Sequence, residues 1–235
     1  DGFIKTFTIP ADGSSITEVA SLEHDTIYNN YNRLLKFYED TYLLAYLGTG
    51  SGGHHLKTFT IPADGTSITE VDSTQINSYS TWISDLNKID NNTVLYTGSG
   101  WATYSISSDG SIIQKAASGS NPLNNGYRSS VVHVEGDIYA VAMRDKIVTL
   151  NITADGSAVT QVTEFDYEEK NISTSPKFLK LNSQHYVVSY QVISSNKDYH
   201  LKLIEISADG QTITSAGNLT HETNQSHNSE IALVK

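Results

Sequence analysis

The sequence predicts an all-β protein, a five-bladed β-propeller of four-stranded antiparallel blades, with one blade split between the termini. Three observations lead to this prediction: an internal repeat, a regular series of Asp-Gly pairs, and paired apolar runs between them. The repeat is nearly exact, since Lys5–Val19 reads KTFTIPADGSSITEV and Lys57–Val71 reads KTFTIPADGTSITEV. A four-stranded unit that recurs about every 40–50 residues is typical of propeller blades.

Five Asp-Gly pairs, each between two alternating runs, predict one β-hairpin in every repeat. The pairs lie at 12–13, 64–65, 109–110, 155–156 and 209–210. The run before a pair is the longer one, as in LKTFTI, and the run after it is shorter, as in SITEV. Glycine adopts the positive φ of a tight turn at little cost, so this pattern is a strong hairpin signal. We assign these hairpins to the third and fourth strands of each blade.

Two further apolar runs precede each hairpin after the first and predict the first and second strands. They cover 33–48, 81–98, 129–143 and 176–190, and each is divided by a polar turn. The repeat unit is therefore four strands in roughly 47 residues. A row of hairpins in a solenoid, or a sandwich, is the alternative, although a sandwich swaps its strands between sheets by Greek-key connections.

The first hairpin has no apolar pair before it, and the C-terminal run Glu230–Val234 is predicted to complete its blade. One domain over 1–235 then contains five units, at 1–25 with 227–235, 26–73, 74–118, 119–164 and 165–226. The split blade still lacks its second strand. Because an unpaired strand edge accepts a strand from another chain, we expect head-to-tail strand donation and filaments, with a merely truncated blade as the alternative.

The composition limits the classes of binding partner and the cellular compartments that fit this protein. A net charge of −11 and a pI near 5.0 argue against nucleic acid, whose phosphates require a basic surface. No run of apolar residues is long enough for membrane insertion. The absence of cysteine excludes disulfides, thiolate zinc sites and a thiol nucleophile. Five sequons favour an extracellular or cell-surface glycoprotein, with candidate glycosylation sites at Asn91, Asn151, Asn171, Asn218 and Asn224.

The long connections between blades, and between the second and third strands, share one face of the disc, where we expect a binding site. Equivalent residues would circle the mouth of the central channel there. They are Tyr31, Tyr79, Tyr127 and His227, followed by Asn32, Arg128 and Asn228. Aromatic faces beside amide groups suit a sugar ring, which predicts a lectin-like site. The alternative is that the tyrosines pack between blades.

No motif predicts catalysis, a metal or a cofactor, and we expect a protein that is not an enzyme. A glycosidase would need two carboxylates about 5–10 Å apart, and Asp85 is the carboxylate best placed to face the channel. The other acidic candidates lie between blades at Glu23, Asp25, Asp72, Glu164, Asp166 and Glu222. Calcium bound by Glu23 with Asp25 is a further hypothesis, although the dense ligands of a calcium loop are lacking.

The run Asp1–Asp25 resembles tandem repeats of large secreted or cell-surface proteins of archaea and bacteria. The shared elements are the TFTI–ADG–ITEV core, the following LEHD at 22–25, and a DTYLLAY-like strand at 40–46. The resemblance is strong over residues 1–71 and fades later, where YSISSDGSI keeps only the hairpin. It implies a structural or adhesive role outside the cell. The loops are low in charge and rich in asparagine, serine and tyrosine, so we expect glycans or other surface proteins as partners.

Overall fold

The computed structural model describes residues 1–26, 29–48, 53–77, 85–98, 100–111, 113–119, 129–168, 176–192, 198–222 and 231–232. Eighteen β-strands within these ranges form five antiparallel sheets, and no helix occurs among these residues. The all-β prediction is therefore confirmed. We number the sheets I to V in chain order.

Sheet I has two strands, and each of the other four sheets has four strands paired in chain order. Sheet I contains β1 (Gly2–Thr8) and β2 (Thr17–Asp25). Sheet II contains β3 (Asn29–Tyr38), β4 (Thr41–Gly48), β5 (Gly53–Thr60) and β6 (Thr69–Asn77). Sheet III contains β7 (Asp85–Lys88), β8 (Thr93–Thr97), β9 (Trp101–Ile106) and β10 (Ile113–Gly119). Sheet IV contains β11 (Ser130–Glu135), β12 (Ile138–Ala142), β13 (Lys146–Ile152) and β14 (Val159–Asp166). Sheet V contains β15 (Lys177–Lys180), β16 (His185–Gln191), β17 (Tyr199–Ile206) and β18 (Ile213–Glu222).

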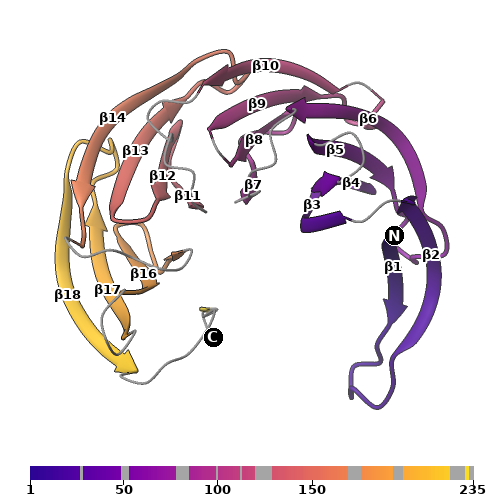
Figure 1. Ribbon diagram of the computed structural model, residues 1–235, viewed down its shortest axis with the longest axis horizontal. Helices are drawn as coiled ribbons and strands as arrows, with labels where there is room; N and C mark the ends of the chain where they lie inside the picture. Colours follow the sequence, from indigo (N-terminus) through magenta and orange to yellow (C-terminus); the bar gives the residue numbers. More distant parts are fainter. Residues whose placement is uncertain are drawn as a thin grey trace.

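The five sheets follow one another around an arc, as the blades of a propeller do (Figure 1). The first strand of each four-stranded sheet lies nearest the centre and the fourth lies on the outside. Sheets I and V form the two ends of the arc, on either side of its opening. The predicted order of four strands per blade is thus confirmed for sheets II to V.

The hydrophobic core is divided into four clusters, one at each junction between consecutive sheets. At the I/II junction, for example, Ile4 of β1 packs with Tyr46 of β4 and with Phe59 of β5. Sheets II, III and IV each lie between two other sheets, so their inner strands are apolar on both faces. In β4, for example, Leu43 and Leu44 are both buried, although they point to opposite faces.

A threonine side chain hydrogen-bonds each of the first four sheets to the next sheet, and we call this hydrogen bond the threonine latch. The threonine lies on β1 in sheet I and on the third strand of sheets II, III and IV. The side-chain hydroxyl donates to the carbonyl of the Asp-Gly glycine in the following sheet. The pairs are Thr6 with Gly65 at 2.7 Å, Thr58 with Gly110 at 2.7 Å, Thr103 with Gly156 at 2.6 Å, and Thr149 with Gly210 at 2.7 Å. Each hydroxyl also accepts a main-chain N–H from the adjacent fourth strand, as Thr58 does from Asp72 at 3.0 Å. Leu203 occupies the fifth equivalent position.

The split blade is described only in part. Of the predicted strand 230–234, the structure describes Ile231 and Ala232, and neither belongs to a strand. Glu230, Leu233 and Val234 lie outside the described residues. Within the described chain, β1 pairs with β2 alone, so sheet I consists of a single hairpin at the end of the arc.

Candidate ligand-binding site

An open hollow of about 390 Å³ lies between sheets I and II, where β2 and β4 end and β5 begins. This is the face that carries the long connections, where a binding site was expected. The hollow is lined by β2 and the residue after it, and by β4, β5 and β6. The lining residues are Glu23, His24, Asp25, Thr26, Tyr46, His55, Lys57 and Ser73.

Tyr46 is the central aromatic side chain of this site. Its ring stacks on the His55 imidazole, with centroids 5.3 Å apart and an interplanar angle of 21°. The ring of His24 meets it edge-on, with centroids 4.9 Å apart. Burial, followed by the hydrogen bond to the Asp25 carboxylate, raises the pKa of the Tyr46 hydroxyl. The phenol therefore stays protonated and acts as a donor that holds Asp25.

Both imidazoles of the hollow are neutral near pH 7. Burial lowers the pKa of His24, and the charge of Lys57 lowers it further against the opposing effect of Asp25. Burial also lowers the pKa of His55 more than Asp25 raises it. A neutral imidazole offers one donor and one acceptor nitrogen, which is the hydrogen-bonding pattern of a hydroxyl group.

Lys57 connects the two sheets beneath the hollow. Its ammonium donates to the carbonyl of His24 at 2.7 Å and pairs with Glu70 at 3.0 Å. Only 15% of the Lys57 side chain is exposed, compared with 41% for the equivalent Lys5, which pairs with Glu18 in the first hairpin. Lys57 therefore positions β2, and with it His24 and Asp25, against β5.

The same constellation recurs at the IV/V junction. Tyr190 stacks on His200, with centroids 5.4 Å apart and an angle of 18°, and Tyr167 meets it edge-on at 5.1 Å. The Tyr190 hydroxyl donates to Glu168 at 3.0 Å, and the ammonium of Lys202 donates to the carbonyl of Tyr167. The two sites thus have a tyrosine, a histidine, a lysine and a carboxylate at equivalent positions. Tyr167 occupies the position that is equivalent to His24.

The other two junctions lack the aromatic pair. The positions equivalent to Tyr46 and His55 are Gly98 and Gly100 in sheet III, and Met143 and Lys146 in sheet IV. A sequence signal for the site does exist, because the tripeptide HLK occurs at 55–57 and again at 200–202, in each case nine or ten residues after the tyrosine that stacks on its histidine. Sequence reasoning placed the binding site on the long connections, which include those between the second and third strands before these histidines. It missed the pairing of each histidine with a tyrosine on the neighbouring strand.

Of the residues predicted to form a ligand-binding ring, the structure describes only Tyr31 and Asn32. Tyr31 is half-buried against the apolar cluster between sheets II and III, in an irregular part of β3 where its φ is 59°. Asn32 beside it is exposed. The remaining candidates lie outside the described residues: Tyr79, Tyr127, Arg128, His227 and Asn228. For Tyr31, the structure supports packing between blades, which was the alternative to sugar binding.

Asp85 is engaged by the main chain. Its carboxylate accepts the N–H of Val131 in sheet IV at 3.0 Å and the N–H of Leu86 at 3.0 Å. Burial raises the pKa of Asp85, against the lowering effect of these hydrogen bonds. Asp72 likewise accepts the N–H of Ile113 in sheet III at 3.1 Å. These two carboxylates connect neighbouring blades, which is a structural explanation for their presence.

The other candidate sites are placed as follows. Asn91 lies in an exposed turn, and Asn218 is exposed on β18, whereas Asn151 is half-buried on β13 in the middle of sheet IV. Asn171 and Asn224 lie outside the described residues. Glu23 and Asp25 line the same hollow, but no three His, Cys, Asp or Glu residues of the described chain are grouped to hold a metal ion. In the same part of the chain, no helix has the length and apolar character needed to cross a membrane.

No protein-family model and no curated protein matches this sequence. Solved structures do resemble it. A Lactobacillus plantarum protein has a TM-score of 0.68 at 14% identity, over 92% of this chain and 64% of that one. A putative 6-phosphogluconolactonase from Bacteroides uniformis has a TM-score of 0.66 at 11% identity, also over 92% and 64%. The WD40 domain of SCAP from fission yeast has a TM-score of 0.54 at 12% identity, over 92% and 58%.

This chain therefore spans less than two thirds of the length of these similar structures. The likeness concerns the fold, because the identities are all below 15%. Together with the sheet topology, it shows that the chain is a β-propeller of five sheets, of which sheet I contributes two strands.

Proposed function

We propose that this chain is an extracellular structural or adhesive propeller module whose long-connection face contacts glycans or other surface proteins. The observation that carries the proposal is the Tyr–His–carboxylate constellation, which is built at the I/II junction and again at the IV/V junction. A rigid scaffold that presents two equivalent sites can engage a repetitive surface at two points, which increases the strength of attachment.

A neutral ligand rich in hydroxyl groups fits the chemistry of these sites best. The hollow offers the Asp25 and Glu23 carboxylates as acceptors and a neutral His55 as donor or acceptor. The carboxylates and the net charge of −11 would repel an anionic ligand. Carbohydrate binding by a lectin-like propeller is therefore the alternative that these sites favour.

Binding can be tested with a glycan array followed by calorimetry on the best ligand. We expect Asp25→Asn and Glu168→Gln each to weaken binding, and the double variant to raise the Kd at least about tenfold, because a charged acceptor is lost at both sites. Asp137→Asn is the matched control, since Asp137 is exposed in the turn between β11 and β12, on the opposite face. Folded protein that binds no glycan would remove the lectin form of the proposal.

Glycoside hydrolysis is the remaining alternative, and the geometry supports it less well. It depended on Asp85, whose carboxylate already accepts two main-chain N–H groups. An Asp85→Asn variant should therefore lose stability rather than an activity, as thermal unfolding and polysaccharide digestion assays would show. The enzyme hypothesis would regain support if the native chain hydrolysed a polysaccharide and the Asp85→Asn variant folded normally but had lost this activity.

Self-assembly at sheet I is the second part of the proposal. In the described chain, one edge of β1 pairs with β2 and the other edge makes no ladder, so it has main-chain groups to offer a strand. Strand donation to this edge is one route of assembly, and packing against the open face of the same sheet is another. Light scattering over a wide concentration range tests both, because assembly makes the mass rise above 25.7 kDa.

A further inference from the structure

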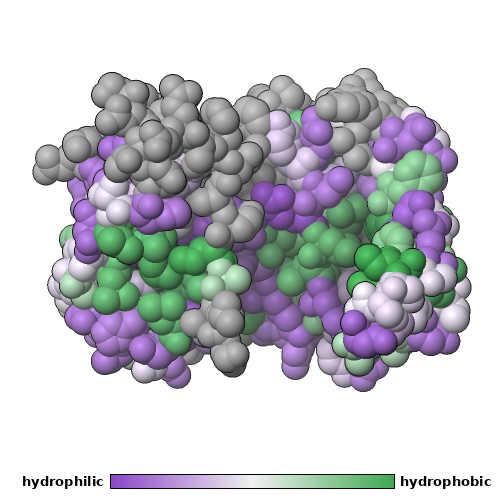
Figure 2. Space-filling view, turned by 90° about the horizontal axis from the view of Figure 1, so that it is seen from below, coloured by the Kyte–Doolittle hydropathy of each residue, from purple (hydrophilic) through white to green (hydrophobic). Residues whose placement is uncertain are grey.

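The site formed by Asp25, Tyr46 and His55, which we call the I/II site, lies where the hydrophobic core meets the polar edge of the disc. Tyr46 belongs to the apolar cluster between sheets I and II and is 2% exposed, whereas His55 and Asp25 are half-buried. Figure 2, which looks into the opening of the arc, shows this layering for the whole molecule, with a hydrophobic band between hydrophilic rims. A charge at such a boundary loses part of its hydration, so its formation depends on the charged groups beside it.

Gly48 allows the His55 imidazole and the Asp25 carboxylate to face the same point. A Cβ atom added at Gly48 would lie 3.2 Å from the Nε2 atom of His55 and 3.5 Å from an oxygen of Asp25. Because glycine has no side chain, nothing from this residue separates the two groups. Opposite charges within about 4–6 Å stabilise one another, so a protonated His55 can pair with Asp25 across Gly48.

The equivalent site between sheets IV and V, which we call the IV/V site, differs at this point. Val192 occupies the position of Gly48, two residues after the stacked tyrosine, and is 2% exposed. A valine side chain therefore takes up the space that Gly48 leaves at the I/II site. The tyrosine–histidine stack is nearly the same in both sites, with centroids 5.3 Å and 5.4 Å apart, so the stack accepts either residue.

The ionisable groups around His55 come from β2, β4, β5 and β6. They are Glu23, His24, Asp25, Tyr46, Lys57 and Glu70. Burial has the largest effect and lowers the pKa of His55, with Lys57 adding to the lowering and Asp25 opposing it. Burial and Lys57 also lower the pKa of His24 against Asp25 and Glu70, and the α-amino group of Asp1 adds to this lowering. Both rings are therefore neutral at pH 7.5 and take up protons below about pH 6.5.

We propose that the I/II site releases its ligand on acidification, because a protonated His55 pairs with Asp25 and makes this carboxylate unavailable to the ligand. The inference rests on the glycan binding proposed above and adds its regulation. At pH 7.5, Asp25 accepts a ligand hydroxyl and the neutral His55 serves as donor or acceptor. At lower pH the imidazolium replaces the ligand at the carboxylate, and a protonated His24 adds a second positive charge. Affinity is thus full above pH 6.5 and falls as the pH drops through the titration of His55.

The pH dependence is measured by calorimetry on the neutral glycan that binds most strongly on the array described above. All proteins carry Glu168→Gln, so that binding at the IV/V site does not mask the I/II site. We expect the Kd to rise about two- to tenfold between pH 7.5 and pH 5.5, as for binding coupled to the loss of one or two protons.

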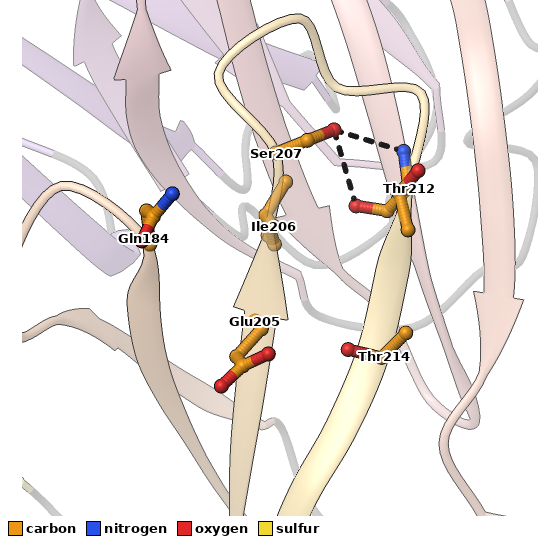
Figure 3. Close-up of a pocket in the computed structure, with 6 residues that line it drawn as sticks. All are labelled: Gln184, Glu205, Ile206, Ser207, Thr212 and Thr214. Atoms are coloured by element: carbon orange, nitrogen blue, oxygen red, sulfur yellow. Dashed lines mark hydrogen bonds between the residues drawn. The ribbon is translucent and has the colours of Figure 1, made fainter.

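His185→Gln is the matched control. The Nε2 atom of His185 also lies beside a carboxylate, 3.1 Å from Glu205, but this pair is on the opposite face of the disc, where β16 begins. Glu205 lines a separate pocket of about 220 Å³ there (Figure 3). The control variant should keep the full pH dependence, and a loss of the dependence in it would overturn the assignment to the I/II site.

Two variants of the I/II site test the geometry. Gly48→Val introduces the valine of the IV/V site, where the same stack forms, so the variant should fold. His55→Gln keeps a donor and an acceptor but does not titrate. We expect the Kd of each variant to change by less than about twofold between the two pH values. A rise as large as that of the unaltered I/II site in both variants would overturn the pairing of His55 with Asp25.

A measurement without ligand separates this inference from the proposed binding. In an NMR titration of His55, we expect Asp25→Asn to lower its pKa, because the imidazolium loses its partner. An unchanged titration would overturn the pairing. Folded protein that binds no neutral glycan at either pH would overturn the proposed binding and its regulation together. Glycan binding with the same Kd at both pH values would preserve the binding and overturn this inference alone.

Discussion

The hairpin of sheet I and the outer hairpin of sheet II have almost the same sequence and the same local structure. Gly13 and Gly65 have φ values of 67° and 66°, and each donates its N–H to a proline carbonyl three residues earlier. Both ladders shift register at the same point, between Thr6 and Phe7 and between Thr58 and Phe59. Both carry the same lysine–glutamate pair across their strands. Fourteen identical residues in fifteen thus fold the same way twice.

Their burial nevertheless differs strongly on one face. Phe7 is 51% exposed and Phe59 is 0% exposed, and the corresponding isoleucines, Ile9 and Ile61, are 60% and 6% exposed. The difference arises because sheet I covers the face of sheet II that carries Phe59 and Ile61. No described sheet covers the corresponding face of sheet I, which carries Phe7 and Ile9. The comparison teaches that the repeated sequence specifies the structure of the hairpin. The position of the hairpin in the arc determines how much the same side chain contributes to the free energy of folding.

Truncating the two phenylalanines should produce the largest difference between the hairpins. Phe59→Ala leaves a cavity at the I/II junction, and we expect it to lower the free energy of unfolding by about 3–5 kcal/mol. Phe7→Ala removes a side chain that is half-exposed, and we expect a loss below about 1 kcal/mol. Denaturant unfolding measures both. Equal losses would mean that the face of sheet I is covered in solution, as it would be in the proposed assembly.

Removing the latch hydroxyls should have the next largest effect. Thr58→Val leaves the buried carbonyl of Gly110 and the N–H of Asp72 without this partner, at a cost of about 1–3 kcal/mol. Thr6→Val breaks the equivalent bonds to Gly65 and Ala20 where they are half-buried, and water can replace them in part. The smaller loss expected for Thr6→Val is measured by the same unfolding experiment. A larger loss at Thr6 would contradict the burial-based ranking.

The two turn glycines sharpen the comparison further. Gly13→Ala and Gly65→Ala both place a side chain at positive φ, which costs about 1–2 kcal/mol. At Gly65 the new Cβ also crowds Thr6 at 3.2 Å, so its loss should be greater, by an amount below about 1 kcal/mol. The difference in unfolding free energy between the two variants measures the crowding alone. If Gly13→Ala proves as costly as Gly65→Ala, a neighbouring sheet is seated on the first hairpin.

The smallest effect should be a pH dependence at the I/II junction. The pKa values of His24 and His55 are lowered in the folded chain, so the unfolded chain binds more protons below about pH 6.5. The free energy of unfolding should therefore fall as the pH drops below 6.5 toward those lowered values. His24→Tyr introduces the residue found at the equivalent position of the IV/V junction, Tyr167, and should flatten this dependence. Thermal unfolding at pH 7.5, 6.5 and 5.5 checks it, and an unchanged slope in the variant would exclude His24 as a cause.

Much of the fold could be predicted from the sequence because its determinants are local. The Asp-Gly pairs and the alternating runs beside them predict hairpins, and strands neighbouring in sequence pair in every sheet of the described chain. The candidate site was less predictable. Asp25, Tyr46 and His55 come from three strands of two sheets, and no spacing rule relates them. Asp85 was singled out as the carboxylate best placed to face the channel. In the structure its carboxylate joins β7 to β11, a contact that depends on how two blades dock.

By itself, the sequence determined the turns, the strand pairing and the number of sheets, because each of these depends on hydrogen bonds and backbone conformations within some twenty residues. Only the tertiary structure decided that Phe59 is core and Phe7 is surface, that Thr58 latches onto Gly110 while Leu203 ends the series, and that Tyr46 stacks on His55 beside Asp25. Burial depends on the area that another sheet removes from water, and that sheet comes from a distant part of the chain.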